Sequence, residues 1–144
     1  TSLSLNSDGQ GATLDGRNLG HIIRMYTGSE LRLESLTLKN GVATRGGGIF
    51  VLTERCRLSL TNCLVTNGEA NTFGGLMIVK AHSHVTIIGS SMVNGSAGGR
   101  GGGFKAESAT IVMLACRFAD CSATNFLLAI ANTASHDSNM FRKT

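Results

Sequence analysis

The chain has 144 residues, including 19 Gly and no Pro; 42% are hydrophobic, 15% are charged, and the formal net charge is +4. This length allows one domain with a continuous core, the apolar content is too high for a disordered chain, and abundant Gly without Pro excludes collagen. The basic residues are scattered without interleaved aromatic residues, which argues against a nucleic-acid-binding stripe.

The first segment, residues 1–11, is predicted to be an N-terminal strand or cap. Residues 1–6, Thr-Ser-Leu-Ser-Leu-Asn, alternate as a strand does, and they lack the charged and apolar regions of a signal peptide. The chain does not begin with Met, so we expect a processed chain or a fragment of a longer one. No apolar run approaches the roughly 20 residues of a membrane span, so we expect that the chain does not span a membrane.

An Asn-Gly dipeptide then recurs at a fixed period. It occurs at Asn40-Gly41, Asn67-Gly68 and Asn94-Gly95, so the interval from the first copy to the second equals that from the second to the third. A constant period of this length is typical of repeat proteins, in which each repeat forms one structural unit. We therefore predict regular coils over residues 12–121, with a period of 26–28 residues.

Strand-like segments precede each Asn-Gly pair at the same phase. Apolar and polar residues alternate within them, which is the period of two that strands show. When the coils are aligned, three columns are apolar throughout, and we expect them to face the core. These columns are Leu31, Leu58, Val85 and Ile111; Leu33, Leu60, Ile87 and Met113; and Leu38, Val65, Met92 and Phe118.

Clusters of Gly mark another corner of each coil. Residues 46–48, 74–75 and 101–103 are Gly, and a short apolar segment follows each cluster. Gly allows the backbone to approach other groups closely at such corners. Stacked coils with two or three short strands each predict an all-β fold, a right-handed parallel β-helix (solenoid) of about five to six coils. Residues 122–144 are predicted to form a last partial coil or a C-terminal cap.

The Asn residues of the repeated dipeptide, Asn40, Asn67 and Asn94, are predicted to form a structural ladder. Amide side chains stacked at strand spacing can hydrogen-bond from one coil to the next. We expect this ladder to satisfy buried polar groups at a turn, and a row of ligand-binding amides is the alternative. Asn94-Gly95-Ser96 also matches the N-glycosylation sequon, but burial of Asn94 would make that match accidental.

Four cysteines and two neighbouring histidines are candidates for disulfides or metal binding. Cys63 and Cys116 share a column two coils apart, roughly 9–10 Å at strand spacing, whereas bridged Cα atoms lie within about 7 Å. We therefore expect free thiols. His82 and His84 can share a strand face, but zinc needs three or four ligands and no matching column points there. No metal or other cofactor is predicted.

The outward columns contain no candidate catalytic residues. No two carboxylates stack in them, so neither the paired acids of glycoside hydrolysis nor an acidic calcium cluster is expected. Ile88, Val112 and Leu114 are apolar where earlier coils carry polar residues, so we predict that something covers them. The alternatives are the C-terminal segment near residues 126–141, a partner chain such as a second copy joined through the C-terminal coils, or missing sequence. The outward columns are Arg32, Ser59, Thr86 and Val112; Glu34, Thr61, Ile88 and Leu114; and Thr37, Leu64, Ser91 and Arg117.

The segment Leu36-Thr37-Leu38-Lys39-Asn40-Gly41, followed by Gly46-Gly47-Gly48-Ile49, resembles the repeats of the polymorphic outer membrane proteins. Gly74-Gly75-Leu76 and Gly102-Gly103-Phe104 are similar to the Gly-Gly-Ala-Ile pattern of that family, and Phe118-Ala119-Asp120 to its Phe-x-x-Asn motif. The resemblance covers residues 12–121. It implies a pectin-lyase-like β-helix in an extracellular or cell-surface context, and it transfers no catalytic residue.

Together these features favour a non-catalytic surface module that is structural or adhesive. We expect it to bind a surface glycan, a protein partner or the remainder of a larger chain along an outer face, through Thr, Ser, Asn and Arg side chains. A polysaccharide lyase or hydrolase of the same fold is the alternative, and it would need acidic and basic residues brought together from the turns. An ice-binding solenoid is a minor alternative, which would need a regular outward row of Thr.

Overall fold

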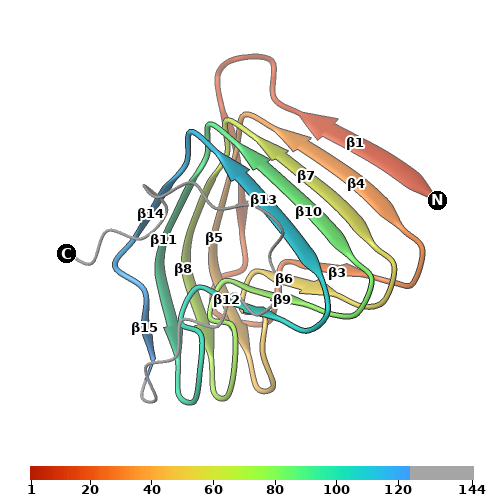
Figure 1. Ribbon diagram of the computed structural model, residues 1–144. Coiled ribbons are helices and arrows are strands. Elements are labelled where there is room, and N and C mark those ends of the chain that lie inside the picture. Colours follow the sequence, from red (N-terminus) through yellow and green to blue (C-terminus); the bar gives the residue numbers. More distant parts are fainter. Residues whose placement is uncertain (124–144) are drawn as a thin grey trace.

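The computed structural model describes residues 1–123, and this part of the chain is built from strands and the turns that join them. Fifteen strands wind into a parallel β-solenoid of about five turns (Figure 1). Each strand pairs in parallel with the equivalent strand of a neighbouring turn, as in the register of Leu31 with Leu58 and of Leu58 with Val85. The predicted all-β fold of stacked parallel coils is confirmed.

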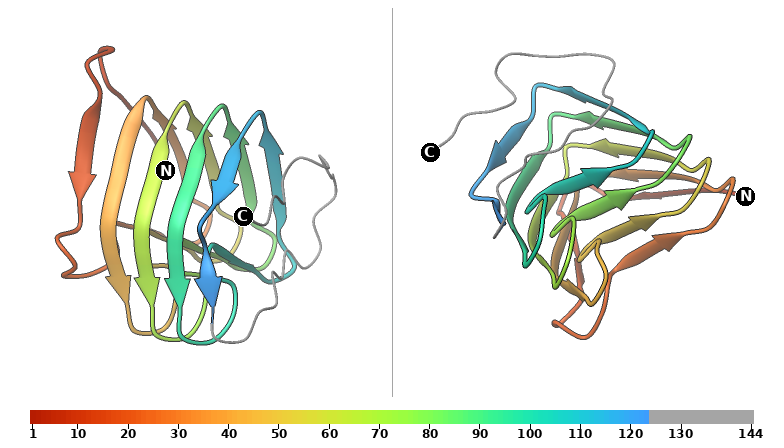
Figure 2. Two further views of the ribbon diagram at one scale, coloured as in Figure 1. Left: turned by 90° about the vertical axis from the view of Figure 1, so that its left-hand side faces the viewer. Right: turned by 60° about the horizontal axis from the view of Figure 1, so that its bottom comes forward.

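The strands form three sheets, and successive turns add strands to the same sheets (Figure 2). Sheet A stacks β1 (Ser2–Asn6), β4 (Glu30–Glu34), β7 (Arg57–Thr61), β10 (His84–Ile88) and β13 (Thr110–Leu114). Sheet B stacks β2 (Ala12–Asp15), β5 (Leu36–Ala43), β8 (Leu64–Ala70), β11 (Ser91–Ala97) and β14 (Arg117–Ala119), and β15 (Ser122–Ala123) also pairs with β11. Sheet C stacks β3 (Ile23–Met25), β6 (Phe50–Leu52), β9 (Met77–Val79) and β12 (Phe104–Ala106).

Columns of apolar side chains fill the space that the three sheets enclose. The strand register places the residues of each predicted column on neighbouring strands, and the two sheet A columns are buried throughout. In the sheet B column, Phe118 of the last described turn is only half-buried. Sheet C adds the buried column Phe50, Met77 and Phe104. A repeat of nearly constant length therefore stacks similar side chains, and each turn covers the core of its neighbours.

Single residues in the left-handed backbone conformation bend each turn at recurring positions. They have φ values between 48° and 80°, where Gly is unstrained and Asn is the best tolerated side chain. One such residue changes the chain direction without interrupting the stacking of the next strand. The positions are Gly28, Arg55, His82 and Ser108 between sheets C and A; Ser35, Asn62, Gly89 and Ala115 between sheets A and B; and Asn40, Asn67, Asn94 and Asp120 in the sheet B layer.

The Gly clusters lie where the chain passes from sheet B into sheet C, and their requirement is space. A Cβ atom on Gly75 would overlap the backbone of Gly102 and Ser96 in the next turn, and one on Gly48 would overlap the backbone of Gly75 and Glu69. The predicted close approach of the backbone at these clusters is thus confirmed.

The two ends of the described chain differ in how far they follow the repeat. β1 pairs in register with β4, and its core-facing residues Leu3 and Leu5 are 53% and 40% exposed. At the other end, residues 122–123 form β15, whereas the rest of the predicted cap, including the segment near residues 126–141, lies outside the described residues. Residues 1–123 contain no helix of the length and apolar character needed to cross a membrane.

Candidate functional site

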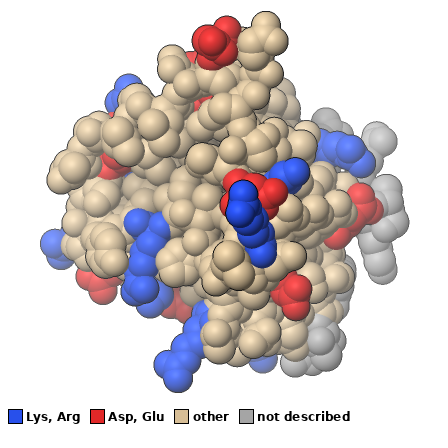
Figure 3. Space-filling view, turned by 180° about the vertical axis from the view of Figure 1, so that it is seen from behind, with Lys and Arg blue, Asp and Glu red and all other residues tan. Residues whose placement is uncertain are grey.

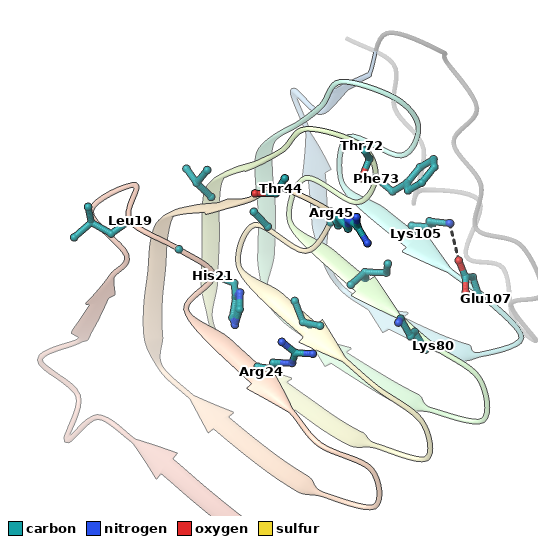
Figure 4. A pocket seen from close by; sticks show the side chains of 16 residues that line it. Leu19, His21, Arg24, Thr44, Arg45, Thr72, Phe73, Lys80, Lys105 and Glu107 are labelled. Atoms are coloured by element: carbon teal, nitrogen blue, oxygen red, sulfur yellow. Dashed lines mark ion pairs between the residues drawn. The ribbon is translucent and has the colours of Figure 1, made fainter.

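A groove of about 790 Å³ lies along the outer face of sheet C, beside the loops that enter this sheet from sheet B (Figure 4). Its floor is an outward column with one residue per turn: Arg24, Val51, Ile78 and Lys105. The loops supply its wall, which includes Arg45 and Phe73. The apolar middle of the floor lies between a guanidinium at one end and an ammonium at the other.

The groove is strongly cationic. Arg24, Arg45, Lys80 and Lys105 line it together with one carboxylate, that of Glu107. Lys105 Nζ lies 2.6 Å from Glu107 Oε1, so this pair neutralises itself. The ion pairs formed by residues 1–123 include none from Arg24, Arg45 or Lys80, which leaves these three cations available to an anionic ligand.

Aromatic rings and a hydroxyl complete the groove and its surroundings. Lys105 Nζ lies 3.9 Å from the centroid of the Phe73 ring, and the Arg24 guanidinium lies 5.6 Å from that of Tyr26. Within the described part of the chain, Thr72 Oγ1 is the one buried side-chain oxygen or nitrogen without a hydrogen-bond partner. Buried polar groups are nearly always paired, so an unpaired hydroxyl in the wall of a groove is notable.

The rest of the charged surface is more evenly mixed. The face opposite to that of Figure 1 shows Lys and Arg in small separate groups, with acidic and uncharged side chains between them (Figure 3). On sheet A, Arg32 pairs with Glu30 at 2.7 Å, and on sheet B Lys39 pairs with Asp15 at 3.7 Å. Exposed pairs of this kind contribute little binding or stability.

The predicted Asn residues form a chain of side-chain hydrogen bonds that all run in one direction. Asn94 Nδ2 donates to Asn67 Oδ1 at 3.4 Å, and Asn67 Nδ2 donates to Asn40 Oδ1 at 3.2 Å. Asn40 Nδ2 then donates to Asp15 Oδ1 at 3.0 Å, so a carboxylate terminates the ladder. Asp120 has the same left-handed backbone one turn after Asn94.

The expectation that this ladder is buried was wrong. Asn67 and Asn94 are exposed and Asn40 is half-exposed, because it is the following Gly that takes the inward position. Gly41, for example, is buried, and a Cβ atom there would overlap the backbone of Gly48. The ladder therefore lies on the outside of the solenoid, and burial does not protect Asn94 of the sequon from modification.

We expect the ladder to contribute modestly to stability, and Asn67 tests this. Replacement by Gly keeps the left-handed backbone and removes the hydrogen bonds of the Asn67 amide with Asn40 and Asn94, and the one it accepts from Thr66. The free energy of unfolding should therefore fall by about 1 kcal/mol. Replacement by Ala adds a left-handed strain of roughly 1–2 kcal/mol. Urea unfolding of the wild type and both variants measures these differences in the free energy of unfolding. If the Gly variant is as stable as the wild type, the ladder contributes nothing to stability.

The ladder also predicts a dependence of stability on pH through Asp15. The Arg17 N–H donates to Asp15 Oδ1 at 2.9 Å, and with the Asn40 amide it holds the pKa of this carboxyl below its ordinary value of 3.8. A lowered pKa in the folded state stabilises the protein above the unfolded pKa, and this stabilisation is lost as the pH falls through the folded value. Thermal unfolding between pH 2 and 7 should therefore show a steeper acid loss for the wild type than for Asp15→Asn. Equal slopes would contradict this.

The apolar strip predicted as an interface lies at the last two turns of sheet A. Ile88 pairs with Leu114, and they are 41% and 52% exposed, while Val112 is half-buried beside Thr86. The residues are neighbours, and what covers them stays a prediction.

The cysteines are free thiols, as expected, and Cys56 and Cys63 are buried. Burial raises the pKa of the Cys63 thiol, which donates to the Thr61 carbonyl at 3.3 Å. Among the described residues no group of three or more His, Cys, Asp or Glu side chains could hold a metal ion, and His82 and His84 are both exposed.

Comparison of the chain with family models, curated proteins and solved structures found no match. The groove is the feature that sequence reasoning missed, since Arg24 and Arg45 look like scattered residues of a solvated surface. The available signal was the outward column of sheet C, in which Arg24 and Lys105 lie three periods apart.

Proposed function

We propose that this chain is a non-catalytic extracellular or cell-surface module, structural or adhesive, that binds a glycan or protein partner in the groove on sheet C. We further propose a right-handed, pectin-lyase-like β-helix related to the polymorphic outer membrane protein repeats. The motif at residues 36–41 and 46–49 supports the relationship. Connections between parallel strands are almost always right-handed, which supports the hand.

One observation carries the binding proposal. The groove brings together Arg24, Arg45 and Lys80, and these cations form no ion pair with another described residue. Like charges gathered without counter-charges repel one another, and an anionic partner would relieve that repulsion. The volume of about 790 Å³ is within the range of ligand-binding clefts.

The chemistry of the groove favours binding over glycoside hydrolysis. Glycoside hydrolysis by the common mechanism needs two carboxyl groups that flank the scissile bond. Among the described residues the groove offers one carboxylate, and Lys105 already holds it at 2.6 Å. A hydrolase acting by that mechanism in this groove would lack its second acid.

Adhesion assays with charge-matched variants test the proposal. Beads coated with wild-type protein are measured for retention on immobilised cell-surface glycans and matrix proteins. Arg24→Gln combined with Lys80→Gln should reduce retention about tenfold or more, because each charge-assisted contact is a strong one. Arg32→Gln combined with Arg57→Gln removes equal charge from sheet A and should leave retention within about twofold. Equal losses in both variants would overturn the groove as the binding face, and cleavage of any glycan would overturn the proposal of a non-catalytic module.

A further inference from the structure

We propose that two copies of this chain join end to end at the N-terminal edge of the solenoid, where β1 of one copy pairs antiparallel to β1 of the other. The partner at this edge is a second copy of the same chain. The edge is separate from the sheet C groove, because strand pairing uses main-chain groups and leaves the outer faces of the sheets free. Each copy would therefore keep its groove, and the dimer would present two of them.

β1 is the first strand of sheet A, and no described strand pairs with its outer side (Figure 1). All of its residues, Ser2–Asn6, are exposed. Natural proteins usually protect such an edge with a charged side chain, a Pro or a β-bulge. Ser2–Asn6 contains no charged residue and no Pro, and it pairs with β4 residue by residue without a bulge. The edge is therefore open to pairing with another strand.

β1 bonds to β4 through its odd-numbered residues. The Glu30 N–H donates to the Thr1 carbonyl at 2.9 Å, and the Ser7 N–H donates to the Glu34 carbonyl at 3.2 Å. In a parallel pair the main-chain groups that point to the neighbour come from every second residue, so the alternate residues point to the free edge. These residues are Ser2, Ser4 and Asn6. Their N–H and C=O groups are available to a new strand.

The same end of the solenoid exposes side chains that belong to the core. Leu3 and Leu5 lie in register with Leu31 and Leu33, which are buried in the next turn. Leu3 and Leu5 themselves are 53% and 40% exposed, because no described turn lies beyond them. In a solenoid each turn covers the core of its neighbours. A strand that brings apolar side chains to the same positions would bury both leucines.

The sequence of β1 makes a second copy a matching partner. In an antiparallel pair with Ser4 on a two-fold axis, Leu3 of one copy lies opposite Leu5 of the other, and Ser2 lies opposite Asn6. The even-numbered residues then form the hydrogen-bonded pairs, and the leucines form the closer, non-hydrogen-bonded pairs on the core side. The two Ser4 hydroxyls meet on the outside, and no like charges lie opposite each other. The free main-chain groups and the exposed leucines are thus satisfied by one register.

The two-fold contact also limits the assembly to two copies. It uses the same edge of both chains, so a dimer has no free β1 edge left. Contact between β1 and the opposite end of a second copy would leave a free edge at each end. Such a contact would add copies without closing.

Analytical ultracentrifugation of the 144-residue chain, with any purification tag at its C-terminus, tests the proposal. We expect an equilibrium between monomer and dimer that depends on protein concentration. Amide hydrogen exchange should slow at Ser4 and Asn6 as the concentration rises, and it should change less at Leu5, whose N–H already points to β4. A chain that is still monomeric at about 1 mM would overturn the proposal. So would species that grow beyond a dimer, or a dimer in which exchange at Ser4 and Asn6 is unchanged.

Charge variants at the two-fold axis locate the interface. Ser4→Lys and Ser4→Glu each place two like charges opposite each other, and each should weaken the dimer about tenfold or more. A mixture of the two variants places Lys opposite Glu and should dimerise about tenfold or more tightly than either variant alone. Ser59→Lys is the matched control, because Ser59 and Ser4 lie on either side of Arg32 in one outward column. Ser59 lies away from the edge, so this control should change the dissociation constant less than about twofold.

Circular dichroism of each variant shows whether the solenoid still folds. If folded Ser4→Lys dimerises as tightly as the wild type, or if the mixture gains nothing over the single variants, β1 is not the interface. Ile88→Lys combined with Leu114→Lys tests the apolar strip of sheet A as the other candidate. Loss of the dimer in that variant, with the dimer retained in Ser4→Lys, would place the contact on the strip and overturn the proposal.

Discussion

Gly75→Ala is expected to abolish cooperative folding, or to lower the free energy of unfolding by about 4 kcal/mol or more. The added Cβ would overlap the backbone oxygen of Gly102 and the backbone nitrogen of Ser96. Neither atom can move away as a side chain would, because both belong to the next turn of the solenoid. Separating the turns would break the parallel pairing on which the stacked coils depend.

Gly20→Ala is the matched control for this variant. A Cβ atom at Gly20 meets nothing within 4 Å, and its backbone is not in the left-handed region. Urea unfolding followed by circular dichroism should therefore show a midpoint close to that of the wild type. If Gly75→Ala were as stable as Gly20→Ala, the conclusion that the turns stack too closely at Gly75 to admit a Cβ atom would be wrong.

Phe50→Ala is expected to cost about 3–5 kcal/mol of unfolding free energy, the range found when a buried aromatic residue is truncated. Phe50 is fully buried in β6, paired with Ile23 of the preceding turn and Met77 of the next. Loss of the ring leaves a cavity between two turns. The cavity cannot collapse, because the strand pairing holds the two turns in place. Thermal unfolding measures the effect, and Phe50→Leu should lose clearly less. Equal losses for Ala and Leu would mean that packing volume at this position is not what matters.

The fold was predictable because the same pattern of strand-like segments recurs in successive coils. A constant period places Leu33, Leu60 and Ile87 at one phase, and parallel strands with the same register then bury all three. A single alternating segment can be misread as a strand. Several strand-like segments that recur at a fixed spacing and phase indicate stacked coils. The free cysteines followed from the same alignment, which placed Cys63 and Cys116 in one column two coils apart.

The site was less predictable, because it depends on where loops and bends direct side chains. Arg45 and Arg24 are distant in sequence, and the winding of the chain brings the loop of Arg45 and the strand of Arg24 to one groove. The burial of the Asn ladder was mispredicted because periodicity gives the column but not its side of the backbone. Asp15 was missed as the end of the ladder because β2 pairs with β5 at an offset of 24 residues, as in Asp15 with Lys39, which does not follow the Asn-Gly period.

Backbone hydrogen exchange tests the central claim, that the groove on sheet C is the binding face. Exchange would be followed with and without the cell-surface glycan or matrix protein that retains the wild-type protein most strongly in the adhesion assay. The account predicts slower exchange on binding in the loops at residues 44–48 and 71–76, with no change in β7 and β10 of sheet A. Protection centred instead on the strip of Ile88 and Leu114, or no protection of the groove by that partner, would contradict it.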